Sequence, residues 1–206
     1  MSGKKIMTRK NLPELYILRH GQTEWNAVGR MQGHLDSPLT NLGQEQARTQ
    51  LRILKAQNLP ADTTFHCSPL GRARQTAALA LAGLTKRPCF DDRLKEISVG
   101  KFEGLTMYDL DTCWPEIMRA SSPYSWHYRA PGGERFVDFR ARIKDWLDEQ
   151  TTTAVVVTHG MTSGVLRGLA LGLDVDGVAK LPGGQGVIYH IKDGAQHRLD
   201  AQSIKT

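Results

Sequence analysis

Short apolar runs recur along the chain, and each ends at a polar or turn residue. Such a run, bounded by turn residues and rich in β-branched side chains, predicts a buried strand. Four segments fit this description: LYILR (15–19), TFHCSPL (64–70), AVVVT (154–158) and GVIYHIK (186–192), of which GVIYHIK alternates well enough to be the last strand.

Between these runs, apolar residues recur at the spacing of an amphipathic helix. Ala47, Leu51 and Leu54 follow this spacing within 40–57, where Thr40 is placed to cap the helix. Further helices are expected over 72–81, over 164–173, and in the segment that contains Phe136, Phe139, Ile143, Trp146 and Leu147.

Strands that alternate with helices predict a mainly parallel sheet covered on both faces, which is a three-layer α/β/α sandwich. Because no internal repeat or low-complexity linker divides the chain, we expect a single domain over 13–206 after a short basic arm, residues 1–12. Residues 100–131 contain several Trp and Pro residues and fit the alternation poorly. We interpret them as a helical or irregular excursion that forms a cap over a pocket.

Composition narrows the function classes. The 206 residues are 40% hydrophobic and carry a net charge of +6, which favours an anionic ligand or surface. Cys67, Cys89 and Cys113 suggest neither a disulfide framework nor a zinc ribbon, and they fit a reducing cytoplasm. No apolar run approaches the ~20 residues of a membrane span, and MSGKKIMTRKN lacks the apolar centre of a secretory signal. We therefore expect a cytoplasmic protein without a membrane partner.

The segments LYILRHG and AVVVTHG share one construction, in which an apolar strand leads to His20 or His159 and then to glycine. Parallel strands place their carboxyl ends at one edge of the sheet, where ligands bind in α/β folds. Both imidazoles should therefore face one crevice, together with Arg19. Arg72 opens the helix after TFHC, and we expect its guanidinium and the free N–H groups of that helix to point to the same edge. This set predicts an anion site.

These groups suit phosphoryl transfer. Cations stabilise the charge on the phosphoryl oxygens, and a neutral imidazole can be the nucleophile near pH 7. A carboxyl group can protonate the leaving oxygen and then activate water. Glu96 and Glu103 in RLKEISVGKFEG are both candidates for this role, and the residue types alone do not choose between them.

A cysteine nucleophile is one alternative, because HCSPLGRAR (66–74) is similar to the loop of cysteine-dependent phosphatases. The spacing from Cys67 to Arg72 is one residue too short for that loop. Pro69 also has no N–H group to offer to a phosphate. We interpret Cys67 as a small buried residue at a strand end.

Three further alternatives stay open. The basic charge would suit a nucleic-acid module, but the basic residues are scattered and no nucleic-acid motif is present. A non-catalytic binder of phosphorylated ligands would also fit, because a fold alone does not guarantee activity. A metallohydrolase could take its ligands from four histidines, but their spacing along the chain matches no metal-binding motif: His20, His34, His66 and His159.

Six motifs occur in a characteristic order: RHGQTEWN, GRMQGHLDSPLTNLG, CSPLGRARQTA, LKEISVGKFEG, PGGE and VVVTHG. Together they resemble the histidine phosphatase superfamily, also called phosphoglycerate mutase-like, from Tyr16 to about Tyr189. The resemblance implies a mainly parallel sheet between helices and an enzyme that needs no metal.

The resemblance also assigns roles to residues. His20 matches the phosphorylated nucleophile, and Glu96, rather than Glu103, matches the proton donor. The positions expected around the transferred phosphoryl group are Arg19, Arg72, His159, Asn26, Gln32 and Met161.

Within this superfamily the chain looks like the phosphatase branch. The mutases continue from the acid as Glu-Arg-His-Tyr-Gly and carry a longer insert, whereas here Glu96 is followed by Ile-Ser-Val-Gly. Phe102 departs from a common Trp and Arg135 from a common Ser, which bears on the choice of substrate. Sugar phosphates, phosphoglycerates, phosphoserine and ribazole phosphate all remain candidates.

The resulting expectation is a metal-independent phosphomonoester hydrolase that acts through a phosphohistidine on a small phosphorylated metabolite. Phosphoglycerate mutase-type phosphoryl transfer is the alternative within the superfamily. No nucleotide cofactor is expected, because neither a P-loop nor G-x-G-x-x-G is present. The excursion offers aromatic residues that either contact the rest of the substrate or, more commonly for such residues, belong to the core: Phe102, Tyr108, Trp114, Trp126 and Tyr128.

Overall fold

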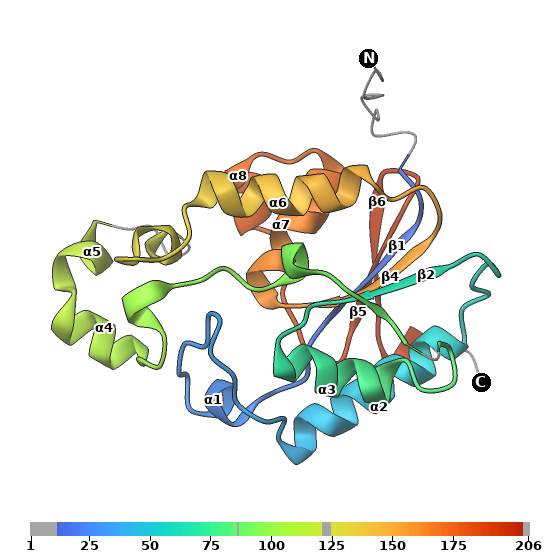
Figure 1. Ribbon diagram of the computed structural model, residues 1–206, viewed down its shortest axis with the longest axis horizontal. Coiled ribbons are helices and arrows are strands. Elements are labelled where there is room, and N and C mark those ends of the chain that lie inside the picture. Colours follow the sequence, from blue (N-terminus) through green and yellow to red (C-terminus); the bar gives the residue numbers. More distant parts are fainter. Residues whose placement is uncertain (1–11, 86, 121–124, 204–206) are drawn as a thin grey trace.

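A central sheet organises the molecule (Figure 1). The computed structural model describes residues 12–85, 87–120 and 125–203, and within them the sheet has six strands in the order β3-β2-β4-β1-β5-β6. β1 to β4 are mutually parallel, β5 pairs antiparallel with β1, and β6 pairs antiparallel with β5. The strands are β1 (Leu15–Arg19), β2 (Thr64–Cys67), β3 (Cys89–Phe90), β4 (Ala154–Thr158), β5 (Ile188–Lys192) and β6 (Ala195–Leu199).

Helices cover both faces of this sheet, which confirms the predicted three-layer sandwich (Figure 1). α2 (Asn41–Lys55) and α3 (Gly71–Ala80) lie on one face, and α6 (Phe136–Asp148) and α7 (Gly160–Leu171) lie on the other. The shorter helices are α1 (Glu24–Ala27), α4 (Met107–Cys113), α5 (Pro115–Arg119) and α8 (Val175–Ala179), together with the 3₁₀ turns η2 (Asp92–Leu94), η3 (Gly100–Phe102), η4 (Trp126–Arg129) and η5 (Ala201–Ser203).

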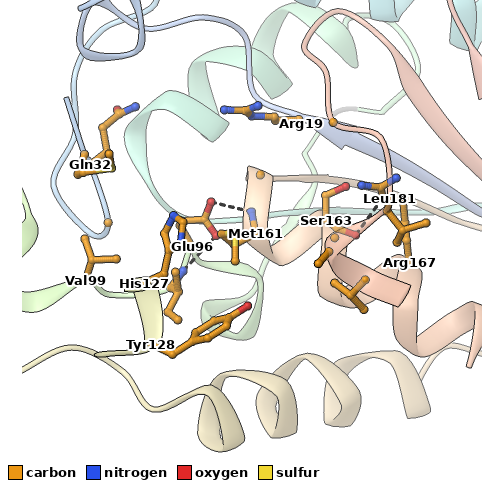
Figure 2. A pocket seen from close by; sticks show the side chains of 18 of the residues that line it. Arg19, Gln32, Glu96, Val99, His127, Tyr128, Met161, Ser163, Arg167 and Leu181 are labelled. Atoms are coloured by element: carbon orange, nitrogen blue, oxygen red, sulfur yellow. Dashed lines mark hydrogen bonds between the residues drawn. The ribbon is translucent and has the colours of Figure 1, made fainter. Parts of the chain in front are cut away.

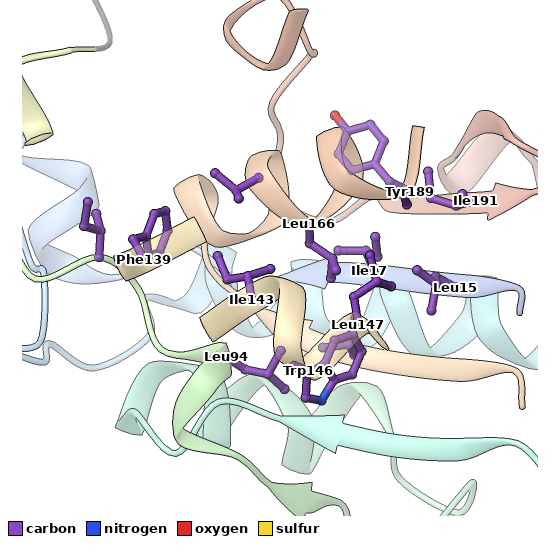
Figure 3. Close-up of a cluster of buried hydrophobic side chains, with 14 of the residues drawn as sticks. Leu15, Ile17, Leu94, Phe139, Ile143, Trp146, Leu147, Leu166, Tyr189 and Ile191 are labelled. Carbon is purple, nitrogen blue, oxygen red and sulfur yellow. The ribbon is translucent and has the colours of Figure 1, made fainter. Parts of the chain in front are cut away.

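The alternation of side chains along β1 divides the core into two clusters. Leu15 and Ile17 pack against the side of α6 and α7, where Trp146 is fully buried (Figure 3). Tyr16 and Leu18 point to the opposite face and pack with residues of α2 and α3. A strand that is buried on both faces explains why LYILR is an almost continuous apolar run.

Several predicted elements are close to those observed. AVVVT is β4 without a shift, and α2 occupies most of 40–57 with the Thr40 side chain accepting from Gly43 N as its N-cap. The helix predicted over 164–173 begins four residues earlier, at Gly160. Its first N–H groups are bound by the carboxylate of Glu96, 64 residues before it, and local sequence carries no signal of that contact.

The prediction that GVIYHIK is the last strand was wrong. β6 follows β5 through a turn in which Asp193 and Gly194 both have positive φ, the conformation that Asp-Gly favours in tight hairpins. β6 was missed because its sequence, AQHRL, is mostly polar and exposed, as suits an edge strand. β3 was missed because it has only two residues.

The excursion over 100–131 contains η3, α4, α5 and η4, while residues 121–124 lie outside those described. Phe102 and Trp126 are buried in the core, and Trp114 packs against it. Tyr108 is exposed, and Tyr128 lines the cavity that also contains His20 and Glu96. The expected core role therefore holds for Phe102, Trp114 and Trp126. The function of the excursion as a cap stays a prediction.

Residues 1–11 of the predicted basic arm lie outside those described, and Leu12 packs against the core. In the part of the chain that the structure describes, no helix is long and apolar enough to cross a membrane.

Two glycines bring separate backbone segments into contact next to His20. A Cβ on Gly21 would overlap the carbonyl of Gly43, and a Cβ on Gly43 would overlap the carbonyl of Gln22. The N–H of Gly21 also donates to Thr76 Oγ1 at 3.0 Å. The glycine that follows His20 is therefore required by packing, because it lets the loop after β1 lie against the start of α2.

We predict that Gly21→Ala lowers the free energy of unfolding by about 2 kcal/mol or more, because a rigid backbone contact cannot absorb the added methyl group. Urea unfolding measures this change. Gly183→Ala is the matched control, since a Cβ there meets no atom within 4 Å. Equal stability of the two variants would contradict the prediction.

Candidate active site

The ends of β1 and β4 bring the two predicted histidines together. His20 and His159 each follow the last residue of a strand, and their ring centroids lie 5.2 Å apart. Both side chains are buried, and His20 N donates to Thr158 O at 2.9 Å. The paired strands therefore hold both imidazoles at one edge of the sheet, as the sequence predicts.

The contacts of His20 define which of its nitrogens can react. Its Nδ1 lies 2.7 Å from the carbonyl of Gly21, which can only accept, so Nδ1 carries the proton. Nε2 of the neutral ring then keeps a free lone pair. Burial, together with the charges of Arg19 and Arg72, holds the pKa of His20 well below its usual range. The ring is therefore neutral near pH 7 and offers Nε2 as a nucleophile.

His159 is fully buried behind His20 and does not form part of the cavity wall. Its Nε2 lies 2.7 Å from Ser68 Oγ, and within the described residues its buried Nδ1 has no hydrogen-bond partner. Burial, Arg72 and His20 hold the pKa of His159 well below its usual range. The Ser68 hydroxyl orients this ring, a role that sequence reasoning did not assign.

Arg72 differs from its predicted arrangement in one respect. Its guanidinium does reach the site, where Nη1 donates to Leu35 O and to Asp36 Oδ1 at 2.8 and 2.9 Å, and Nη2 donates to Gly33 O at 2.8 Å. The N–H groups at the start of α3 were expected to be free for an anion, but those of Gly71 and Arg72 donate to Asp36. The expectation of free helix N–H groups is therefore wrong, because Asp36 already occupies that helix end.

Four buried polar atoms of the site have no hydrogen-bond partner among the described residues: Arg19 Nε, Arg72 Nε, His159 Nδ1 and Gln32 Oε1. Burial lowers the pKa of both guanidiniums, while the charge of Glu96 partly opposes this effect. The Nε–H groups of Arg19 and Arg72 can only donate, and buried donors without partners are costly, so a ligand that accepts from both would stabilise the site. A tetrahedral oxyanion has that capacity.

The two predicted amide residues lie on the wall of the same cavity. Asn26 Oδ1 accepts from Gln185 Nε2 at 3.2 Å, which leaves its amide NH₂ for a ligand. Gln32 Nε2 donates to Thr23 Oγ1 at 2.9 Å, so its Oε1 is the unpartnered atom. Rotating this amide would let the Thr23 hydroxyl donate to Gln32 and would make the NH₂ group, in place of Oε1, the group left for a ligand of the cavity.

Glu96 and Glu103 have distinct environments. Glu96 lines the cavity at the start of α7, where Oε2 accepts from Met161 N at 3.0 Å and Oε1 accepts from Ile97 N and Thr162 N, each at 3.1 Å. Figure 2 shows the oxygen bound by Met161 on the side of the carboxylate that faces Arg19.

Glu103 lies outside the cavity wall, where it accepts from His34 N and Ser98 Oγ, both at 3.0 Å. The geometry therefore favours Glu96 over Glu103 as the reacting acid. It also shows that the Met161 backbone N–H binds Glu96.

A cavity of about 440 Å³ joins these groups. Of the predicted site residues, His159 alone is absent from its wall among the residues described. Tyr128 and Phe136 add an aromatic wall, and burial with the nearby charge of Glu96 raises the pKa of Tyr128 to about 12. The cavity also reaches Arg167, which sequence reasoning missed because nothing in its neighbourhood along the chain marks it as a ligand-binding residue.

The residues of the alternative mechanisms, the Cys67 nucleophile and the histidine metal ligands, are not arranged for those roles. Cys67 is fully buried outside the cavity wall, and burial raises the pKa of its thiol to about 12. His66 packs its ring edge on Trp146, and His34 contacts the carbonyl of Glu96. Among the described residues, no three His, Cys, Asp or Glu side chains come together as a ligand set.

Comparison with known proteins places the chain in a family. The family model described as "Histidine phosphatase superfamily (branch 1)" matches residues 15–199. A "Probable phosphoglycerate mutase GpmB" of Photorhabdus laumondii is 32% identical over 168 residues, covering 78% of this chain and 75% of the relative. A glucosyl-3-phosphoglycerate phosphatase of Mycolicibacterium vanbaalenii is 37% identical over 199 residues, covering 90% and 86%.

Solved structures of histidine phosphatases are also similar to this chain. A mycobacterial glucosyl-3-phosphoglycerate phosphatase in complex with VO₃ has a TM-score of 0.70 at 29% identity, covering 87% of this chain and 92% of that one. The α-ribazole phosphatase of Shigella flexneri has a TM-score of 0.76 at 24% identity, covering 94% and 98%, and shows the likeness of the fold. The chain belongs to the histidine phosphatase superfamily, with its phosphoglycerate mutase-like fold.

We predict that His20 and His159 stay neutral in the free protein as the pH falls below 6.5, because their pKa values are lowered. NMR titration of the imidazoles, assigned with His20→Asn and His159→Asn, measures this directly. Since the unfolded chain would bind protons at both positions in this range, the free energy of unfolding should decrease as the pH falls. Imidazoles that titrate near 6.5 would contradict the assigned environment.

Proposed function

We propose that this protein is a phosphomonoester hydrolase that acts through a phosphohistidine at His20. The observation that carries the proposal is the Nε2 lone pair of a neutral, buried imidazole, fixed by the Nδ1 contact with Gly21. It is flanked by two arginines whose Nε atoms have no partner among the described residues. Membership of the superfamily and the phosphatase-named relatives support it.

In the first step, the lone pair of His20 Nε2 forms a bond to phosphorus while the bond to the ester oxygen breaks. The leaving oxygen takes a proton from Glu96, whose Oε2 accepts a single backbone hydrogen bond within the described residues and so has room for that proton. The guanidiniums of Arg19 and Arg72 stabilise the charge on the phosphoryl oxygens, and the amides of Asn26 and Gln32 hold those oxygens in line.

In the second step, a water oxygen bonds to phosphorus and the nitrogen–phosphorus bond breaks, which returns the electron pair to His20. Glu96, now a carboxylate, takes the proton from this water. The products are the free alcohol and inorganic phosphate. His159, held by Ser68, packs its ring against that of His20 and helps to fix its position. We expect this chemistry to need no metal and to act on a small substrate in the cytoplasm.

Hydrolysis of p-nitrophenyl phosphate in EDTA, with wild type, His20→Ala and Cys67→Ser, tests the proposal. Wild type and Cys67→Ser should turn over and form an acid-labile phosphoenzyme, whereas His20→Ala should fall to background. Loss of wild-type activity in EDTA would favour the metallohydrolase alternative. An active His20→Ala variant would refute the phosphohistidine mechanism. No turnover of any phosphate by the wild type would favour a binding protein.

Glu96→Gln tests the proton donor. Because alkoxides are poor leaving groups, we expect hydrolysis of an alkyl phosphate to slow by about 10²- to 10⁴-fold, and that of p-nitrophenyl phosphate to slow much less. Glu103→Gln is the matched control and should show no dependence on the leaving group. If Glu96→Gln left alkyl phosphate turnover unchanged, the acid role would move to another group.

Mutase-type transfer is the second candidate, because several relatives are named as phosphoglycerate mutases. A mutase would convert 2-phosphoglycerate to 3-phosphoglycerate, whereas a phosphatase would release inorganic phosphate. Measuring both products in one incubation separates the two functions, and we expect phosphate release to dominate.

A further inference from the structure

The cavity continues beyond the proposed phosphate site, with Arg19 and Arg72, to a third buried cation, Arg167. This side chain comes from α7, is 3% exposed and lines the same cavity as His20. Figure 2 shows its guanidinium beside Ser163 on the side of α7 that faces Arg19. The catalytic proposal above does not use Arg167.

All observed partners of Arg167 are neutral. Nε donates to Ser163 O at 3.2 Å, Nη1 donates to Gln196 Oε1 at 3.1 Å, and Cζ lies 3.9 Å from the ring centroid of Tyr189. Within the described residues, no carboxylate forms an ion pair with Arg167. Asp176 also lines the cavity but is exposed and forms no such pair. A buried guanidinium without a counter-ion is costly unless an anion joins it.

The geometry of α7 places this cation close to the phosphate site. A Cβ on Gly160, the first residue of the helix, would lie 3.4 Å from the Arg19 guanidinium carbon. The bond to the Ser163 carbonyl draws the Arg167 guanidinium back to about the level of residue 163. At a rise of about 1.5 Å per residue, that level is roughly 4.5 Å along the axis from Gly160.

Packing of α8 closes this end of the cavity. A Cβ on Gly168 would overlap a methyl group of Val178, so the glycine lets α8 lie directly on α7. Val178, Ala179 and Leu181 line the same cavity as Arg167. These apolar side chains reduce the access of water, which strengthens any charge pairing formed there.

We propose that Arg167 binds a carboxylate of the substrate, and that the substrate is a small phosphomonoester whose carbon chain carries this carboxylate near the ester oxygen. The inference rests on the proposed function, because it assumes that the phosphate lies at His20. Nη2 is the nitrogen of Arg167 without an acceptor among the described residues. One guanidinium with one unused nitrogen suits a monoanionic carboxylate better than a second phosphate dianion, which needs several cations.

Two substrates that differ only in this group test the proposal. 3-Phosphoglycerate carries a carboxylate where glycerol 3-phosphate carries a hydroxymethyl group. We expect wild-type kcat/KM to be at least ~10-fold higher for 3-phosphoglycerate, as expected for a charged hydrogen bond. In Arg167→Met this ratio should fall to about one. A wild-type ratio near one, or a ratio that Arg167→Met leaves intact, would overturn the proposal.

Matched variants separate recognition from structure. Gln196→Ala removes a neutral partner of Arg167 but keeps the cation, so the ratio should stay within about twofold of wild type. Arg167→Lys keeps the charge and should retain part of the ratio, and it serves in place of Arg167→Met if that variant does not fold. If Arg167→Met and Gln196→Ala change the ratio equally, the role of Arg167 is structural. Preference for propane-1,3-diol bisphosphate would identify a second phosphate instead.

Binding measurements test the carboxylate site independently of turnover. Calorimetry with His20→Ala should give at least ~10-fold tighter binding of 3-phosphoglycerate than of glycerol 3-phosphate, and the difference should vanish in His20→Ala/Arg167→Met. Equal affinities in His20→Ala would refute this role of Arg167. An affinity difference together with a wild type that hydrolyses nothing would refute the hydrolase and leave the carboxylate site standing.

Discussion

The parallel pairing of β1 with β4 is the constraint on which the site depends. Arg19 lies opposite Thr158, and the N–H of His20 continues the ladder to Thr158 O, so both strands end at one level. Because side chains alternate at every residue, a slip of one position would turn one of the two following imidazoles toward the opposite face. The register therefore fixes the contact of His20 with His159. Arg72 and Glu96 approach this pair from elements that pack on the same sheet, so their positions depend on it.

The charges around this pair explain how so many polar groups can be buried together. Asp36 binds the outer edge of Arg72 and the first N–H groups of α3, so one carboxylate satisfies a cation and a helix end at once. Glu96 does the same for the start of α7 while its charge acts on both site arginines. The donors left over point inward, where Nε of Arg19 and of Arg72 have no partner among the described residues. Burial of the two imidazoles, together with the charges of Arg19 and Arg72, also explains why both rings are neutral, since a further positive charge would be unfavourable.

The sequence was most informative where a contact is local. β4 is a run of β-branched residues that needs no partner to be recognised, and Thr40 caps α2 from within the same turn. The strand-end histidines could be placed at one edge because parallel strands share that edge. The contacts that were missed all join distant segments: Asp36 with α3, Glu96 with α7, and Gly21 with Gly43. A pattern read along the chain carries no information on such pairs. β6 shows a different limit, because a polar edge strand lacks the apolar alternation that identifies a strand.

α7 links the two ends of the cavity and fixes the distance between them. Its first N–H groups hold Glu96, its first residue lies against Arg19, and its second turn carries Arg167. A helix is rigid on this length scale, so the groups that contact α7, namely Glu96 as the proposed acid and Arg19 as the proposed phosphate-binding cation, share a fixed reference with Arg167. A substrate that contacts all three groups would therefore be positioned by the helix rather than by flexible loops. The Arg19 guanidinium lies against the first residue of the helix, where a Cβ on Gly160 would make ordinary van der Waals contact with it at 3.4 Å. Chemistry and recognition are thus properties of one element, and a shift of α7 would change both together.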